Sequence, residues 1–211
     1  CREFERDQPW GRILFLALVP KAARAALRRS GRRHIPSTMK IGGGGPGKLP
    51  TSRRLSHVLG YVGLEMFPEA AAELDAIAAS DQSWPAVKAA RVELHMAARQ
   101  WNQVIVVAEP LVRSHPEMAA AWIAWAYALR ELNRIAEART VLLEAEPRHG
   151  QTSAVLHYNL ACYESLLGDL AGARHRLTVA CAMDKRLEID AAADPDLRAL
   201  RNARRRKSKE S

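Results

Sequence analysis

Cysteine is scarce in this 211-residue chain, which contains only Cys1, Cys162 and Cys181. The three form no CxxC pair and no even set, so the sequence provides neither a disulfide framework nor the thiolate spacing of a zinc site. We predict that Cys162 and Cys181 are small buried hydrophobic side chains. A core built without disulfides suits a reducing compartment, and we expect the protein to be cytoplasmic.

Catalytic and metal-binding motifs are also missing. The seven histidines are scattered, with no HExxH sequence and no other close ligand pair, and no nucleophile is paired with a base. Gly42–Lys48 has the glycine and lysine spacing of a phosphate-binding loop, but Leu49 and Pro50 follow where that motif needs Ser or Thr and a helix start. We therefore expect a linker there. Because catalytic and metal-binding motifs are missing, we expect that the protein is not an enzyme and that it has no catalytic residue, metal, cofactor or small-molecule substrate.

The N-terminal region contains only a short apolar run. Ile13–Val19 is seven residues long, whereas a membrane-spanning helix needs about 20. We predict no spanning segment there. Because Lys21, Arg24, Arg28 and Arg29 follow, residues 12–29 could instead form a basic amphipathic helix on a membrane surface, or they could have no such role.

The net charge of +9 is unevenly distributed along the chain. Residues 1–54 contain 13 Lys or Arg against 3 acidic residues, and residues 198–211 contain 7 against 1. The central residues 55–197 contain 12 Lys or Arg against 19 acidic residues. A basic nucleic-acid-binding face on the central region is therefore not predicted. The basic ends are interpreted either as solvated tails or as attachment points for nucleic acid, an anionic membrane or the acidic body itself.

The central region contains an internal repeat. Steps of 34, 34 and 35 residues separate Phe67, Trp101, Ile135 and Leu170. Three further apolar columns keep this register: Ala70, Val104, Ala138 and Ala173; Leu74, Ala108, Leu142 and Leu177; Ile77, Leu111, Ala145 and Ala180. A small residue followed by apolar positions four and seven residues later, at a period near 34, is typical of an array of helix–turn–helix units.

These columns resemble the tetratricopeptide repeat family, whose pattern combines W-x2-L-G-x2-Y in a first helix with A-x3-F in a second. The third unit carries the resemblance most clearly, and the fourth has a related pattern. The matching residues are Trp122, Trp125, Ala126, Leu129, Ala138, Leu142 and Ala145 in the third unit and Leu160, Ala161, Gly168, Ala173, Leu177 and Ala180 in the fourth. The resemblance implies an all-α fold, an α-solenoid of about four antiparallel helix hairpins over residues 51–187.

The expected organisation follows from these columns. The four units span residues 51–84, 85–118, 119–152 and 153–187, with Pro147–Ser153 predicted as a break between helices. Residues 1–50 form a basic, glycine-rich segment without packed structure, in which Met39 could be the native start. Residues 188–203 are predicted to form a C-terminal capping helix, with Asp194 as a cap and Pro195 at a first helical position. Residues 204–211 are predicted to be a basic tail.

The resemblance also implies a function. Similar repeat proteins bind a partner peptide or helix in a groove lined by the first helices, which suggests a protein–protein scaffold or adaptor. Transferred to this sequence, the partner-binding positions are Glu93, Met96, Ile123, Tyr127, Arg130, Tyr158 and Asn159. Packing between first helices is the alternative role for Tyr127 and Tyr158. A chaperone for a secreted or assembling protein, and association with nucleic acid or membrane through the basic ends, remain alternative functions.

Overall fold

The computed structural model describes residues 49–207, and every regular element in this part of the chain is helical. The prediction of an all-α helical repeat is confirmed for these residues. The expectations for residues 1–48, including Ile13–Val19, Gly42–Lys48 and Met39, lie outside the described residues, as does the end of the basic tail. Within the described range, no helix has both the length and the apolar composition needed to cross a membrane.

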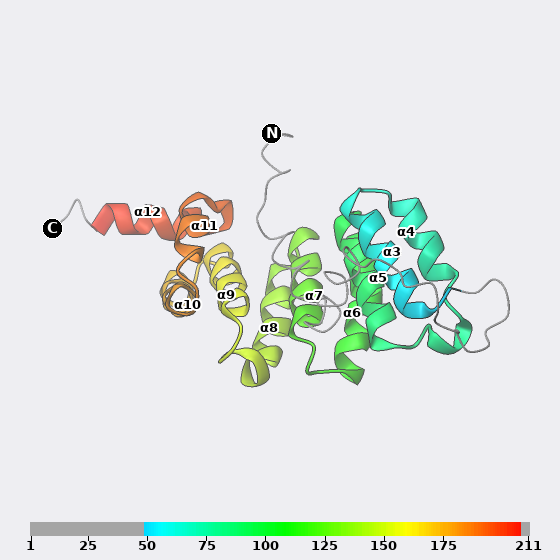
Figure 1. Ribbon diagram of the computed structural model, residues 1–211. Coiled ribbons are helices and arrows are strands. Elements are labelled where there is room, and N and C mark those ends of the chain that lie inside the picture. Colours follow the sequence, from blue (N-terminus) through cyan, green and yellow to red (C-terminus); the bar gives the residue numbers. More distant parts are fainter. Residues whose placement is uncertain (1–48, 208–211) are drawn as a thin grey trace, which may run out of the picture.

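Eight helices form four consecutive hairpins that lie side by side in chain order (Figure 1). The first helices of the hairpins pack against one another in sequence, α3 on α5, α5 on α7 and α7 on α9. The bounds of the eight helices are α3 Thr51–Gly63, α4 Phe67–Asp75, α5 Pro85–Ala97, α6 Trp101–Ser114, α7 Ala119–Glu131, α8 Ile135–His149, α9 Ala154–Leu166 and α10 Leu170–Met183. A short 3₁₀ turn, η1 Ala79–Asp81, follows the first hairpin.

Each hairpin turns at an equivalent residue. The second helices begin at Phe67, Trp101, Ile135 and Leu170, the positions that define the period. Two residues earlier in every unit stands a residue with positive φ: Glu65, Arg99, Asn133 and Gly168. A left-handed residue of this kind ends one helix and redirects the chain. The backbone therefore repeats with the same steps as the sequence, even though only the fourth unit has glycine at this position.

Small side chains allow the two helices of each hairpin to approach closely. The column of Ala70, Val104, Ala138 and Ala173 is completely buried, and the fourth column is buried as well. A bulky residue at the small positions would separate the helices, because protein interiors leave almost no free volume. The buried apolar side chains form two clusters, a smaller one over α3 to α5 and a larger one from α5 to the C-terminal helices.

The C-terminal segment differs from the single capping helix that the sequence predicted over residues 188–203. It contains a short helix, α11 Leu187–Ala193, a 3₁₀ turn, η2 Pro195–Leu197, and a final helix, α12 Arg198–Lys207. The interruption occurs at Asp194, which is extended, as expected of a residue that precedes proline. Asp194 caps η2 by accepting the backbone N–H of Asp196, and Leu197 and Leu200 are buried.

The predicted break at Pro147–Ser153 is partly wrong. Helix α8 continues through Pro147 to His149 and only then turns. Two histidines satisfy main-chain carbonyls around this turn: His149 Nε2 lies 2.8 Å from the Pro116 oxygen, and His157 Nε2 lies 2.8 Å from the Gly150 oxygen. The missing N–H of a proline costs one hydrogen bond, which packing of the last helical turn can offset.

Candidate functional site

The seven positions predicted to bind a partner define the first-helix face, which lies on α5, α7 and α9. Four of them are buried: Glu93, Ile123, Tyr158 and Asn159. The other three, Met96, Tyr127 and Arg130, are half-buried. The side chains of the face are thus mostly covered, and the covering groups determine what the face can bind.

Tyr127 is held by a neighbouring aromatic ring. Its ring meets that of Trp101, the first residue of α6, edge to face with centroids 5.8 Å apart. Burial, together with the nearby Glu131 carboxylate, raises the pKa of the Tyr127 hydroxyl, which therefore stays protonated at neutral pH. Tyr127 packs within the array and still presents part of its surface.

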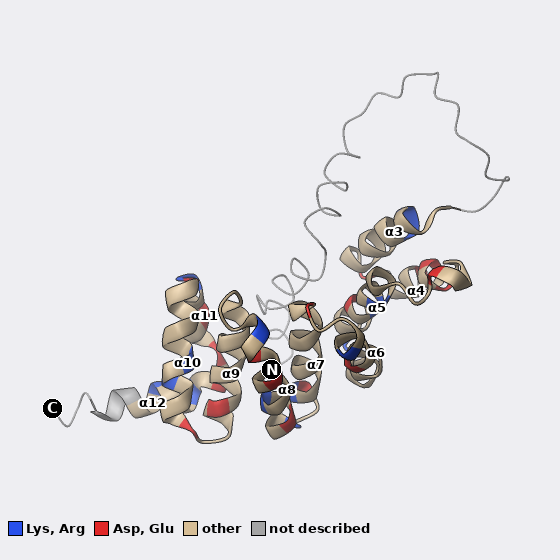
Figure 2. Ribbon diagram, turned by 90° about the horizontal axis from the view of Figure 1, so that it is seen from below, with Lys and Arg blue, Asp and Glu red and all other residues tan. Residues whose placement is uncertain are grey.

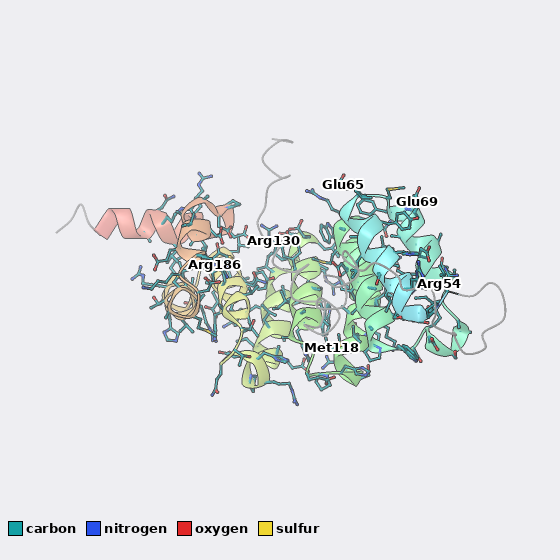
Figure 3. The ribbon with its side chains drawn as sticks, in the orientation of Figure 1. Arg54, Glu65, Glu69, Met118, Arg130 and Arg186 are labelled. Carbon is teal, nitrogen blue, oxygen red and sulfur yellow. The ribbon has the colours of Figure 1, made fainter. Side chains whose placement is uncertain are left out.

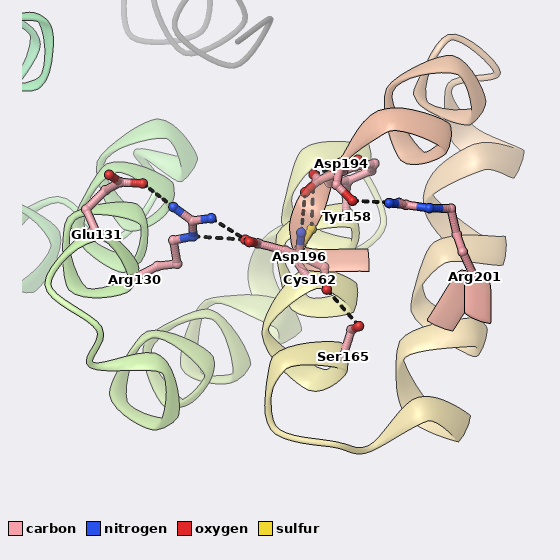
Figure 4. A network of polar contacts seen from close by, with 8 residues as sticks. All are labelled: Arg130, Glu131, Tyr158, Cys162, Ser165, Asp194, Asp196 and Arg201. Atoms are coloured by element: carbon pink, nitrogen blue, oxygen red, sulfur yellow. Dashed lines mark hydrogen bonds and ion pairs between the residues drawn. The ribbon is translucent and has the colours of Figure 1, made fainter. Parts of the chain in front are cut away.

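Arg130 lies at the C-terminal end of α7 (Figure 3) and binds a residue 66 positions away in the sequence. Its Nε donates to Asp196 Oδ2 at 2.9 Å, and its Nη2 donates to Asp196 Oδ1, so the guanidinium holds both carboxylate oxygens (Figure 4). Its third nitrogen, Nη1, donates to Glu131. These carboxylates raise the pKa of Arg130 in spite of its burial. This bidentate contact fixes both the position and the orientation of the Asp196 carboxylate.

Asp194, the residue that caps η2, lies two residues before Asp196 and is buried against α9. The hydroxyl of Tyr158 donates to Asp194 Oδ2 at 2.9 Å, and Cys162 Sγ lies 3.6 Å from the same oxygen. Burial raises the pKa of Asp194, while these donors and the N–H of Asp196 oppose the shift. Asp194 therefore depends on its hydrogen-bond donors to remain ionised inside the fold.

Main-chain contacts complete the arrangement. Ser165 Oγ donates to the carbonyl oxygen of Asp196 at 2.8 Å, and Arg201 Nη1 donates to the carbonyl oxygens of Ala191 and Asp194. Tyr158, Cys162 and Ser165 are spaced four and three residues apart, which places them on one side of α9. The Asp194–Leu197 turn thus lies against α7 and α9, with its side chains and backbone both bound (Figure 4).

The side chains of Cys162, Asp194 and Asp196 offer ligand atoms within 4.8 Å of one another, as three residues of a metal site would. The two carboxylates already have other partners, because Arg130 donates to both oxygens of Asp196 and Tyr158 donates to Asp194. Burial also raises the pKa of the Cys162 thiol well above its usual range, so a thiolate ligand or nucleophile is disfavoured. The arrangement is suited to holding a polypeptide turn.

Sequence reasoning identified Arg130, Tyr158 and Asn159 as members of the first-helix face but did not identify what covers it. Asp196 was not recognised as the partner of Arg130, because nothing in the local sequence connects residues so far apart. The spacing of Tyr158, Cys162 and Ser165 was the available signal, since three side chains with polar atoms on one side of a largely buried helix require partners.

From α4 to α11, Asp and Glu are interspersed with Lys and Arg along the array (Figure 2), whereas α3 and α12 contain arginine and no acidic residue. The comparisons with family models, with curated proteins and with solved structures find no match for the chain. The function must therefore be argued from the geometry of the first-helix face itself.

Proposed function

We propose that this chain is a tetratricopeptide repeat protein that acts as a non-enzymatic, cytoplasmic adaptor and binds a peptide segment of a partner protein on its first-helix face. The observation that carries the proposal is the Asp194–Leu197 turn, a short irregular segment bound across α7 and α9 by Arg130 and Tyr158 of the first-helix face and by the neighbouring Ser165. A surface that holds one polypeptide turn by its backbone and side chains has the chemistry needed to hold another.

The type of contact favours peptide recognition over packing alone. Arg130 binds a carboxylate with two parallel hydrogen bonds, which requires one orientation of the ligand. Ser165 binds a main-chain carbonyl, a group present in any peptide. Polar contacts that combine one specific side chain with backbone groups are typical of peptide-binding sites.

The part of the face beside the turn offers further contacts. Met96 and Tyr127 are half-buried on α5 and α7, and the Trp101 ring lies against Tyr127. Tyrosine, tryptophan and methionine are enriched where proteins bind one another, because they provide large contact areas with a polar or adaptable edge. A partner peptide is therefore expected to run over Tyr127 and Met96.

A random 15-residue peptide library displayed on phage, panned against the full chain, tests this proposal. We expect an enriched peptide family whose synthetic members bind in fluorescence anisotropy. Substitutions Y127A and M96A should weaken that binding about tenfold or more, the effect of losing a contact worth 1.4 kcal/mol. The matched control is V106A, which changes a largely exposed residue on the second helix α6 and should leave binding unchanged.

Circular dichroism of each variant separates a binding effect from unfolding. The proposal is wrong if panning enriches no peptide, or if binding depends on Val106 and not on Tyr127. It is also wrong if the full chain binds only RNA or anionic vesicles, with an affinity that falls steeply with salt, because that result would assign binding to the basic ends.

A further inference from the structure

We propose that the Asp194–Leu197 turn is an internal competitor, and that the partner segment recognised at Arg130 is an acidic turn of the same chemistry, Asp-Pro-Asp-Leu or a close variant. This inference rests on the proposed function and specifies its ligand. The site between α7 and α9 then exists in a self-occupied state, and a partner binds by displacing the turn.

The identity of the ligand follows from the groups that the site provides. Arg130 donates one hydrogen bond to each oxygen of a carboxylate on a short side chain. The Tyr158 hydroxyl binds a second carboxylate two residues earlier, and Ser165 binds the carbonyl between the second aspartate and the next residue. The required pattern is therefore two aspartates separated by one residue.

Proline and leucine complete this pattern. Pro195 holds φ near the value that a 3₁₀ turn needs, which reduces the entropy that the segment loses on binding. Leu197 is completely buried in the large apolar cluster and anchors the end of the turn. A basic or purely apolar peptide would leave Arg130 without the Asp196 carboxylate and with Glu131 as its remaining partner, and losing one carboxylate is costly for a half-buried cation.

Access to the site is also visible in the structure. The side chain of Arg130 keeps 27% of its surface exposed and that of Asp196 keeps 12%, so solvent reaches the edge of the pair. The turn is joined to the array through α11, which has only seven residues. A segment that is part of the same chain competes intramolecularly, so it weakens the binding of a partner.

The test uses the full chain and a fluorescein-labelled peptide with the sequence of residues 190–203. Substitution D196A removes the side chain by which the internal turn holds Arg130, and leaves the receptor residues intact. We expect the D196A chain to bind the peptide about tenfold more tightly than the unmodified chain, because a larger fraction of its sites is open. The double variant D196A/R130A should lose this binding.

Two controls make the result specific. In the D196A background, R134A changes an exposed arginine at the start of α8 that pairs with Glu137, and it should not alter peptide binding. A peptide in which the aspartates equivalent to Asp194 and Asp196 are replaced by asparagine should bind at least about tenfold more weakly, since it cannot form the charged bidentate contact.

The inference is overturned if D196A and the unmodified chain bind the peptide equally, or if R130A has no effect. If D196A does not fold, hydrogen exchange of the unmodified chain in millimolar peptide replaces the binding assay. Exchange should then rise in Leu187–Lys207 and stay constant in α3 and α4, and no rise overturns the inference. Concentration-dependent dimers of D196A in light scattering would identify a second copy as the occupant and also overturn it.

These outcomes are distinguishable from failure of the proposed function. If the library yields a peptide that depends on Tyr127 while the Asp-Pro-Asp-Leu peptide does not bind any variant, the adaptor function stands and the internal-competitor inference fails. If neither peptide binds the folded chain, both fail.

Discussion

Helices α9 and α3 occupy equivalent positions in the fourth and first units and have the same length of 13 residues, yet α9 buries ten of its residues and α3 buries two. The repeat pattern therefore does not determine how much of a first helix is covered. What differs is the number of neighbours. Helix α9 packs against α7, α8, α10, α12 and η2, whereas the described neighbours of α3 are α4 and α5.

This comparison shows that the two ends of the repeat array are covered to different extents. In arrays of this kind each unit buries its apolar surface against its neighbours, so the last unit needs a cap. Here the cap folds back over the first helix of the last unit and brings the Asp194–Leu197 turn onto the predicted binding face. The cap and the occupant of the site are thus the same segment.

The largest effect on this comparison is expected from removing the apolar anchor of the cap. Leu197 is completely buried, so L197A should lower the free energy of unfolding by about 3 kcal/mol. Urea denaturation measures this loss, and hydrogen exchange should show α9 becoming as accessible as α3. The control I189A, at a residue of α11 that is 77% exposed, should change neither. Unchanged protection of α9 in a folded L197A chain would contradict the role of the cap.

The next effect concerns the ion pair that holds the turn. R130A should destabilise the chain by about 1–2 kcal/mol, less than for a fully buried pair because water reaches both side chains. R134A, which breaks the exposed Arg134–Glu137 pair at the start of α8, should have no measurable effect. A double-mutant cycle with D196A measures the coupling, and a coupling of zero would show that the pair does not hold the turn.

A pH titration isolates Asp194. Its pKa is higher in the folded chain than its unfolded value of 3.8, so the folded state binds the proton more tightly. The contribution of Asp194 to stability therefore falls as the pH rises from about 3.8 through the folded pKa. The stability of the unmodified chain relative to D194N should decline over this range and then stay constant. A relative stability that rises with pH would contradict the assigned cause.

The smallest effects are expected at the hairpin turns, where the first and fourth units again differ. Gly168 has φ +88°, so G168A should destabilise the chain by about 1 kcal/mol. Glu65 adopts φ 58° with a side chain, so E65G should stabilise the chain by about 0.5–1 kcal/mol (Figure 3 labels Glu65). Thermal unfolding of both variants measures the difference, and shifts of the same sign would show that the turns are not equivalent.

Much of the fold was predictable because its signals are local. Phe67, Trp101, Ile135 and Leu170 each mark the first residue of a second helix, and the small column three residues later is completely buried. The extension of α8 beyond Pro147 was not predicted, since proline is unfavourable in a helix unless the surrounding contacts compensate. The split of the cap into α11, η2 and α12 was not predicted either, although Asp194 and Pro195 were recognised as a start signal.

For the candidate site, the sequence predicted the residues on the first helices but not the segment that packs over them. Helical spacing placed Tyr127, Arg130 and Tyr158 on first helices, but the exposure of a side chain depends on what packs over it. Tyr158 is completely buried and bound to Asp194, while Tyr127 remains half-buried beside Trp101. Two tyrosines on the first helices of neighbouring units thus received different environments from segments outside their own hairpins.

The sequence by itself determined the helical repeat, its period and the starts of the second helices, because helix formation and the burial of small residues act over a few positions or between adjacent helices. Only the tertiary structure decided that Arg130 meets Asp196 across 66 residues and that the first-helix face of the last two units is occupied. Such a contact depends on the direction in which the chain returns after α10, and that direction is set by the combined packing of α11, η2 and α12 on α9 and α10.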